Sequence, residues 1–170
     1  CQATFNPIVV TVNPLPSGTL SATENSGTAN DNSICSGSNV DFTATAGFNN
    51  YNFMVNAVSQ QNGSSNTYSS SSFINGDVVT VVVTNGTTCT STFNSITITV
   101  IPSPTGALTS SATSICNGDN VDFTATAGYA NYDFQVNGST VQNGSGNTYS
   151  STSLLNGDVV TVVVTSVNDC

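Results

Sequence analysis

The chain contains one long sequence twice. The stretch from Cys35 to Cys89 returns as the stretch from Cys116 to Cys170, and the two copies align without a gap and agree at 37 positions. Self-similarity at a fixed period is the signature of repeat architectures, so a chain of 170 residues predicts two small domains of one kind in tandem. Any function therefore has to belong to an array of one module.

No side chain is positively charged. The chain has no Lys, Arg or His against nine Asp and Glu residues, which gives a formal net charge of −9. Nucleic acid is excluded as a partner because nothing can neutralise a phosphate, and an anionic membrane surface would repel the chain. Membrane insertion is excluded because no apolar run approaches the roughly 20 residues that span a bilayer. A divalent cation is the expected inorganic ligand, so calcium is a candidate cofactor.

The five cysteines stand at matching places in the repeat. This placement predicts an oxidising, extracellular compartment and one disulfide per domain, with the pairs Cys35–Cys89 and Cys116–Cys170. A loop of that length gives about 4 kcal/mol of stabilisation in the chain-entropy model. The alternatives are free thiols or metal ligands, although no CxxC motif or His accompanies them.

The opening segment, residues 1–14, resembles residues 89–102. CQATFNPIVVTVNP matches CTSTFNSITITVIP, so Cys1 corresponds to Cys89 and the segment is interpreted as the last strand of another repeat. That repeat lies either upstream in a longer chain or in a neighbouring molecule, which receives the strand by complementation. A lipid-bearing Cys1 is the alternative. The residues expected to face inward are Phe5, Ile8, Val10 and Val12.

The remaining boundaries follow from the repeat. Residues 15–101 form repeat 1, and residues 102–170 form repeat 2, which lacks the FNSITITV strand that completes repeat 1. Pro-containing hinges, 15–18 and 103–106, stiffen the links between repeats. The absence of a signal peptide and of a starting Met predicts a piece of a longer or processed protein. Repeat 1 has seven extra residues within 23–33, where Glu24 and Asp31 are weak calcium-ligand candidates beside the interpretation as a solvated loop.

Apolar and polar residues alternate along each repeat, as in half-buried strands. In NVDFTATA the inward residues are Val40, Phe42 and Ala44, and turns are expected at 61–63 and 75–77. About seven short strands per repeat and no helical periodicity predict an all-β fold of tandem immunoglobulin-like sandwiches.

The usual side chains of catalysis are missing. Without His or Lys there is no usual general base or Schiff-base amine. Two carboxylate pairs remain, Asp41 with Asp77 and Asp122 with Asp158, and their strand and turn positions favour a structural role. The sequence thus predicts that the protein is not an enzyme.

Five motifs recur in both copies: SIC-x-G-x-NVDFTATAG, NYxFxVN, QNGS-x-NTYS, NGDVVTVVVT and the closing Cys. Together they resemble the tandem immunoglobulin-like or PKD-like repeats of large surface proteins of Bacteroidota, including gliding-type adhesins. The resemblance implies export by the type IX secretion system, a place on the bacterial cell surface, and stalk or adhesin repeats without catalysis.

The sequence therefore predicts a structural repeat of an extracellular bacterial fibre or adhesin stalk with a mechanical, scaffolding role. The expected partners are copies of itself, either along one continuous chain or end to end in a polymer. The alternative is a module that binds glycans or another surface, with or without calcium. The loops 57–60 and 138–141 differ between the copies (AVSQ against GSTV), which weakens that alternative.

Overall fold

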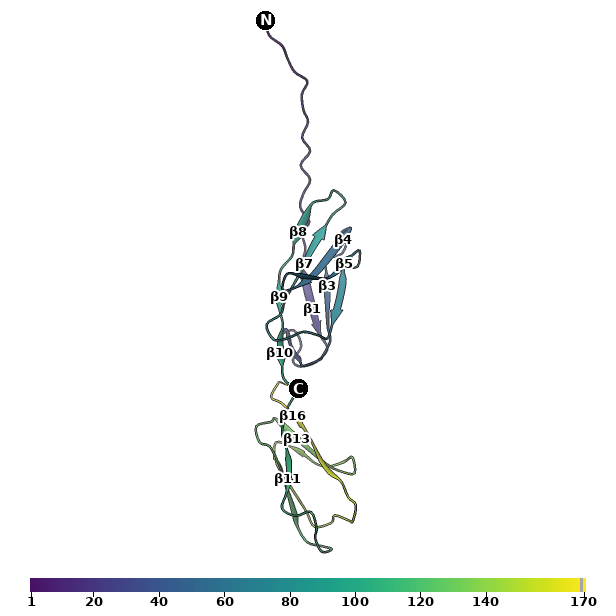
Figure 1. Cartoon of the computed structure of the whole chain (residues 1–170), viewed down its shortest axis with the longest axis vertical. Helices are drawn as coiled ribbons and strands as arrows, with labels where there is room; N and C mark the ends of the chain where they lie inside the picture. The colour runs from purple at the N-terminus through teal and green to yellow at the C-terminus, as the bar shows by residue number, and fades with distance from the viewer. Residues whose placement is uncertain (169) are drawn as a thin grey trace.

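The computed structural model describes residues 1–168 and 170. It shows two β-sandwiches placed end to end, with the opening segment extending away from repeat 1 on the side opposite repeat 2 (Figure 1). Every regular element among the described residues is a strand. No helix in this part of the chain is long and apolar enough to cross a membrane. The predicted all-β, immunoglobulin-like sandwich fold is confirmed.

Repeat 1 contains ten strands in two main layers and a short parallel pair. One layer has the order β1 (Leu20–Glu24), β3 (Val40–Ala44), β6 (Thr67–Ser70). The other has the order β5 (Val58–Gly63), β4 (Asn50–Val55), β7 (Val78–Thr84), β8 (Thr90–Thr92), and β9 (Ile96–Thr97) also pairs with β7. The parallel pair is β2 (Ser33–Cys35) and β10 (Thr99–Ile101).

The core of repeat 1 lies between these layers, as the alternation predicts. Val79, Val81 and Val83 of β7 are fully buried, with their neighbours on the other face only half-buried. Phe42 and Phe53 are also fully buried, and the ring of Tyr68 stacks on both. The segment from β8 to β10 closes this core with Phe93, Ile96 and Ile98, each no more than 8% exposed.

One predicted turn is wrong. Residues 61–63 belong to strand β5, and the hairpin turn between β4 and β5 lies instead at Asn56 and Ala57. Both residues have positive φ, 50° and 64°, as a two-residue type I′ turn requires. Repeat 2 has Asn137 and Gly138 there, so its Asn-Gly dipeptide marks the true turn. The predicted turn at 75–77 is confirmed, because Gly76 has φ +92° and the Asp77 N–H donates to the Ile74 carbonyl.

Repeat 2 has the same two layers with fewer strands. One layer has the order β11 (Leu108–Ser110), β12 (Val121–Ala125), β15 (Thr148–Ser151), and the other β14 (Ser139–Gly144), β13 (Asn131–Val136), β16 (Val160–Thr165). The described residues of repeat 2 include no counterpart of β2, β8, β9 or β10. Its buried core is correspondingly small and consists of Val121, Phe123, Ala125, Tyr132 and Phe134.

Candidate functional site at the junction of the repeats

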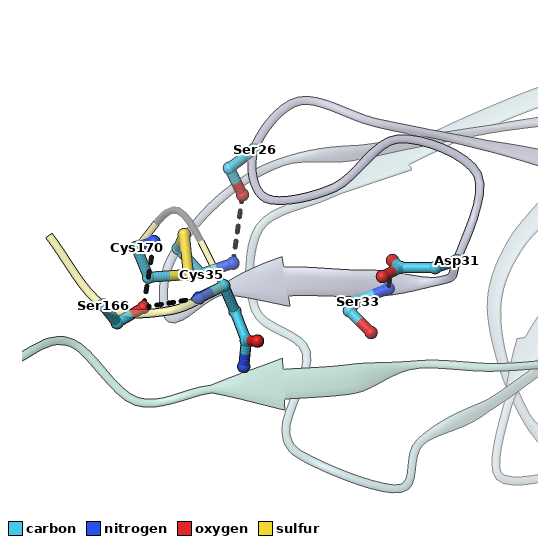
Figure 2. Close-up of a disulfide and its surroundings, with 7 residues drawn as sticks. Ser26, Asp31, Ser33, Cys35, Ser166 and Cys170 are labelled. Atoms are coloured by element: carbon cyan, nitrogen blue, oxygen red, sulfur yellow. Dashed lines mark hydrogen bonds between the residues drawn. A yellow bond between two sulfur atoms is a disulfide. The ribbon is translucent and has the colours of Figure 1, made fainter. Parts of the chain in front are cut away.

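One disulfide joins the two repeats to each other. Cys35 at the end of β2 is bonded to Cys170 of repeat 2, with 5.4 Å between their Cα atoms and a sequence separation of 135 (Figure 2). The predicted pairs Cys35–Cys89 and Cys116–Cys170 are therefore wrong, and so is one disulfide within each domain. Cys1, Cys89 and Cys116 are free thiols in the structure.

The shape of the sandwich explains this correction. Cys35 pairs with Ile101 of β10, the strand that leads directly into repeat 2. Cys89 lies at the other end of repeat 1, in the turn after β7, where the side-chain amide of Asn85 donates to the carbonyl of Pro14 (3.2 Å). The predicted pairing assumed that the two cysteines face each other across one core. They stand instead at opposite ends of the repeat, so each can meet only a neighbouring repeat.

Two serine hydroxyls hold the bonded cysteines in place. The Oγ of Ser26 accepts the backbone N–H of Cys35 (3.0 Å), and the Oγ of Ser166 accepts that of Cys170 (3.1 Å), as Figure 2 shows. Ser26 lies in the seven-residue excess of repeat 1. A Cβ on the adjacent Gly27 would lie 3.7 Å from the carbonyl oxygen of Asn168 in repeat 2. The extra loop therefore supports the junction, a role that sequence reasoning missed.

The polypeptide crosses the junction beside the disulfide. Strand β10 runs parallel to β2, and the backbone N–H of Ser36 donates to the carbonyl of Ile101 (2.9 Å). Residues 102–106 then continue into β11. Two covalent connections, the main chain and the disulfide, thus leave the same end of repeat 1. Together they restrict the rotation of one repeat against the other more than a Pro-containing hinge alone can do.

The calcium candidates have other partners in the structure. The Glu24 carboxylate accepts the backbone N–H groups of Asn30 (3.0 Å) and Asn32 (2.8 Å), and Asp31 accepts that of Ser33 (2.8 Å). In the described part of the chain, His, Cys, Asp and Glu form no group of three or more that could hold a metal ion. Glu24 and Asp31 are thus explained as loop-shaping residues, and calcium binding stays an untested prediction.

The carboxylates of the two predicted pairs also hold local structure. Asp41 accepts hydrogen bonds from Asn25, Asn39 and Ser69, and Asp77 accepts from Asn56 (2.7 Å) and from the N–H of Ile74 (3.0 Å). All of these partners orient a strand or a turn. This supports the structural interpretation of Asp41 and Asp77.

The same carboxylates in repeat 2 have lowered pKa values. Hydrogen bonds from Ser150 and then Asn120 hold the pKa of Asp122 below its usual value of 3.8. The backbone N–H of Leu155 and then the amide of Asn137 do the same for the pKa of Asp158. Both groups stay charged at neutral pH, as acceptors for turn and strand donors.

Comparisons with known proteins give distant likenesses only. No family model matches the chain, and no curated protein matches it. Among solved structures, the fibronectin(III)-like modules of Clostridium thermocellum CbhA share 12% identity over 88% of this chain and 87% of that one, with a TM-score of 0.48. A fibronectin-III array of RIM-binding protein shares 12% identity over 91% of this chain and 60% of that one, with a TM-score of 0.37. The four N-terminal Ig domains of Dscam1 share 10% identity over 92% of this chain and 48% of that one, with a TM-score of 0.26.

Proposed function

We propose that this chain is a structural repeat of an extracellular bacterial fibre or adhesin stalk, with a scaffolding and non-catalytic role. The observation that carries the proposal is the disulfide between Cys35 and Cys170, which fixes one repeat to the next instead of stapling either one. A bond in that place contributes to the spacing and orientation of domains. Those are the properties that a stalk needs and that a single binding module does not.

Two further features support this proposal. A persistent disulfide belongs to an oxidising compartment, which fits a place on the cell surface. The repeated motifs resemble those of large exported Bacteroidota surface proteins, which suggests an adhesin stalk and the type IX secretion route. The chain has no Lys or Arg and a formal net charge of −9, which favours solubility over association with nucleic acid or anionic lipid.

The stiffness of the junction can be tested by small-angle X-ray scattering. We expect the oxidised chain to fit one elongated arrangement of its two sandwiches. The variant Cys35→Ser should keep both sandwiches folded and need a broad distribution of inter-repeat orientations. Cys1→Ser is the matched control, because its thiol is free and exposed and takes no part in the bond, and it should scatter like the parent. Equal curves for Cys35→Ser and the parent would contradict the proposed role of the bond.

The location needs a test on cells. An antibody raised against the folded chain should label intact, unpermeabilised cells of the source organism along extended surface structures. Labelling that appears only after permeabilisation would reject the extracellular role.

A further inference from the structure

Repeat 1 differs from repeat 2 by a compact lobe, residues 24–32, that precedes the bonded cysteine. The lobe contains the seven-residue excess and connects the end of β1 to the start of β2. Glu24 joins its two ends, because its carboxylate accepts the backbone N–H groups of Asn30 and Asn32. Both asparagines have positive φ, 66° and 58°, and turn the chain back on itself. The lobe is therefore held by its own hydrogen bonds.

The lobe is also fixed to the two strands that reach the junction. The carbonyl of Asn32 accepts the backbone N–H of Thr99 in β10 (2.8 Å), and the carboxylate of Asp31 accepts that of Ser33 in β2 (2.8 Å). Strand β10 leads into repeat 2, and β2 ends in Cys35. The lobe is therefore positioned relative to both covalent connections between the repeats.

Two residues of the lobe reach the disulfide. The Oγ of Ser26 accepts the backbone N–H of Cys35 (3.0 Å), as Figure 2 shows. Gly27 has φ +72°, and a Cβ there would lie 3.1 Å from a carbonyl oxygen of β2 and 3.7 Å from that of Asn168 in repeat 2. The lobe thus lies against both halves of the bond, and a glycine allows this close approach.

The turn that holds Cys170 is common to both repeats. The Oγ of Ser166 accepts the N–H of Cys170 (3.1 Å), and the Ser166 N–H donates to the Cys170 carbonyl (3.2 Å). In repeat 1 the Oδ1 of Asn85 accepts the N–H of Cys89 (3.0 Å), and the Asn85 N–H donates to the Cys89 carbonyl (3.1 Å). The closing cysteine of each repeat is therefore presented in the same way.

The opening cysteines are presented differently. Repeat 2 has no lobe, and the backbone N–H of Cys116 donates to the carboxylate of Asp119 (3.0 Å) instead of to a serine hydroxyl. The turn that follows the cysteine is shared, because the N–H of Ser38 donates to the Cys35 carbonyl and that of Asp119 to the Cys116 carbonyl. The lobe is therefore the feature that distinguishes the surroundings of Cys35 from those of Cys116.

The length of the closed loop does not favour the observed pair. The bond between Cys35 and Cys170 spans a sequence separation of 135, which is more than a pair within either repeat would span. Closing a longer loop costs more chain entropy. A folded arrangement that holds two thiols close together outweighs this cost, because it raises their effective concentration. The contacts of the lobe belong to such an arrangement.

We propose that the lobe is a latch, which selects Cys170 as the partner of Cys35 and sets how strongly the bond resists reduction. The inference rests on the stalk proposal and names the regulation of its junction. Ser26 is a positioning residue in this role, because it holds the backbone of Cys35 and does not react. A repeat with the lobe is thereby locked to the repeat that follows it.

The bond forms by exchange with a disulfide oxidant such as oxidised glutathione. The thiolate of Cys35 attacks one glutathione sulfur, which gives a mixed disulfide and releases one glutathione thiolate. The thiolate of Cys170 then attacks the sulfur of Cys35 and releases the second. The two thiol protons go to the released thiolates, so one S–S bond and two reduced glutathione molecules result.

The first test measures this equilibrium in the full chain. Cys1→Ser, Cys89→Ser and Cys116→Ser are introduced together, so that only Cys35 and Cys170 can pair, and every variant carries this background. After incubation at defined ratios of reduced to oxidised glutathione, free thiols are alkylated, and the mass of the intact chain gives the oxidised fraction.

Two substitutions in the lobe form a matched pair. Ser26→Ala should lower the equilibrium constant for bond formation about fivefold, because the Cys35 N–H loses its acceptor. Thr28→Ala is the control, since Thr28 is exposed in the same lobe, and it should stay within twofold of the parent. A loss of stability shared by the oxidised and reduced chains cancels in this equilibrium. A merely structural role of Ser26 would therefore leave the constant unchanged.

The second test concerns the choice of partner. The chain with all five cysteines is refolded from the reduced state in glutathione buffer, and the pairs are identified by mass spectrometry after cleavage at aromatic residues. The parent should form Cys35–Cys170. A variant without residues 24–30, whose loop has the length found in repeat 2, should give a mixture of pairs. If this variant does not fold, the equilibrium of Ser26→Ala decides.

The outcomes separate the latch from the stalk. A lower constant for Ser26→Ala but not for Thr28→Ala, together with mixed pairing after the deletion, supports the latch. Equal constants for Ser26→Ala and the parent, or a deletion variant that forms Cys35–Cys170 as completely as the parent, overturns it. In either of those cases the bond is still present, so the stalk proposal is judged separately by the scattering of Cys35→Ser and by cell labelling.

Discussion

Repeat 1 and repeat 2 share most of their sequence and differ in how well that sequence is buried. Val79, Val81 and Val83 are fully buried in repeat 1, whereas their counterparts in repeat 2, Val160, Val162 and Val164, are only half-buried. The difference comes from β8, β9 and β10, which follow the duplicated stretch in repeat 1. The duplicated stretch therefore does not carry a complete core, and its burial depends on a strand set that follows it.

The largest expected effect on stability comes from truncating a buried side chain of the segment that covers the core of repeat 1. Ile98→Ala should lower the free energy of unfolding of repeat 1 by about 2–5 kcal/mol, because a fully buried Ile is truncated and a cavity remains. Thermal unfolding followed by hydrogen exchange of β7 measures the change. Thr97→Ala, one position away and exposed, is the control and should stay within about 0.5 kcal/mol of the parent. A loss below about 1 kcal/mol for Ile98→Ala would show that this segment adds little to the core.

Equivalent truncations in the two repeats measure directly how much the difference in burial contributes to stability. Val81→Ala should cost about 2 kcal/mol, since two buried methyl groups are lost, and Val162→Ala should cost less than half of that because its site is already open. Denaturant unfolding with a separate exchange readout for β7 and β16 gives both values. Equal costs would indicate that Val162 is as well covered in solution as Val81.

The hairpin turn should give a smaller difference in stability between the repeats, and here the sequence of repeat 2 is the more favourable one. Ala57 has φ +64°, where an L-residue is strained, and repeat 2 has Gly138 at the same place with φ +78°. Ala57→Gly should therefore raise the stability of repeat 1 by up to about 1 kcal/mol, and Gly138→Ala should lower that of repeat 2 by about 1 kcal/mol. The midpoints of thermal unfolding check both signs, and a shift in the same direction for both variants would refute the argument.

The smallest expected effect is the loss of stability of repeat 2 at low pH. Asp122 and Asp158 have lowered pKa values in the folded state, so their contribution to stability is present above the usual value of 3.8 and is lost as the pH falls through the folded pKa. The melting temperature of repeat 2 should thus decline between about pH 4 and about pH 2. The double variant Asp122→Asn, Asp158→Asn should be less stable than the parent at neutral pH and show a shallower decline. A parallel decline in parent and variant would assign the acid sensitivity to other groups.

Much of the fold could be predicted from the sequence, because alternation in segments such as NVDFTATA depends only on local order. The turn at 75–77 followed in the same way from its Asn-Gly-Asp sequence. The turn at 61–63 was misassigned because an Asn-Gly dipeptide is a turn signal whether or not a better hairpin position precedes it.

The disulfide could not be predicted from spacing alone. Two cysteines that bracket one repeat suggest a pair within that repeat, and only the geometry shows that they stand at opposite ends. The supporting residues Ser26 and Ser166 carry no motif and were missed for the same reason. The repeat itself was the available signal. Cys35 opens the first copy of the duplicated stretch and Cys170 closes the second copy, so a bond between the first cysteine of one repeat and the last cysteine of the next was a possible pairing.

The position of this bond changes how the chain carries tension. Under a pull on both ends, the covalent path runs from residue 1 to Cys35, across the sulfur atoms, and out at Cys170. Its fully stretched length is about 120 Å, against about 600 Å for the whole reduced chain. The chain between the two cysteines is shielded, including the whole sheet β14-β13-β16. If the bond recurs along an array, only a stretch equivalent to that from Cys89 to Cys116 is exposed to tension in each pair of repeats. Such a fibre would keep nearly constant length even where its domains unfold, and reduction would convert it into an extensible one.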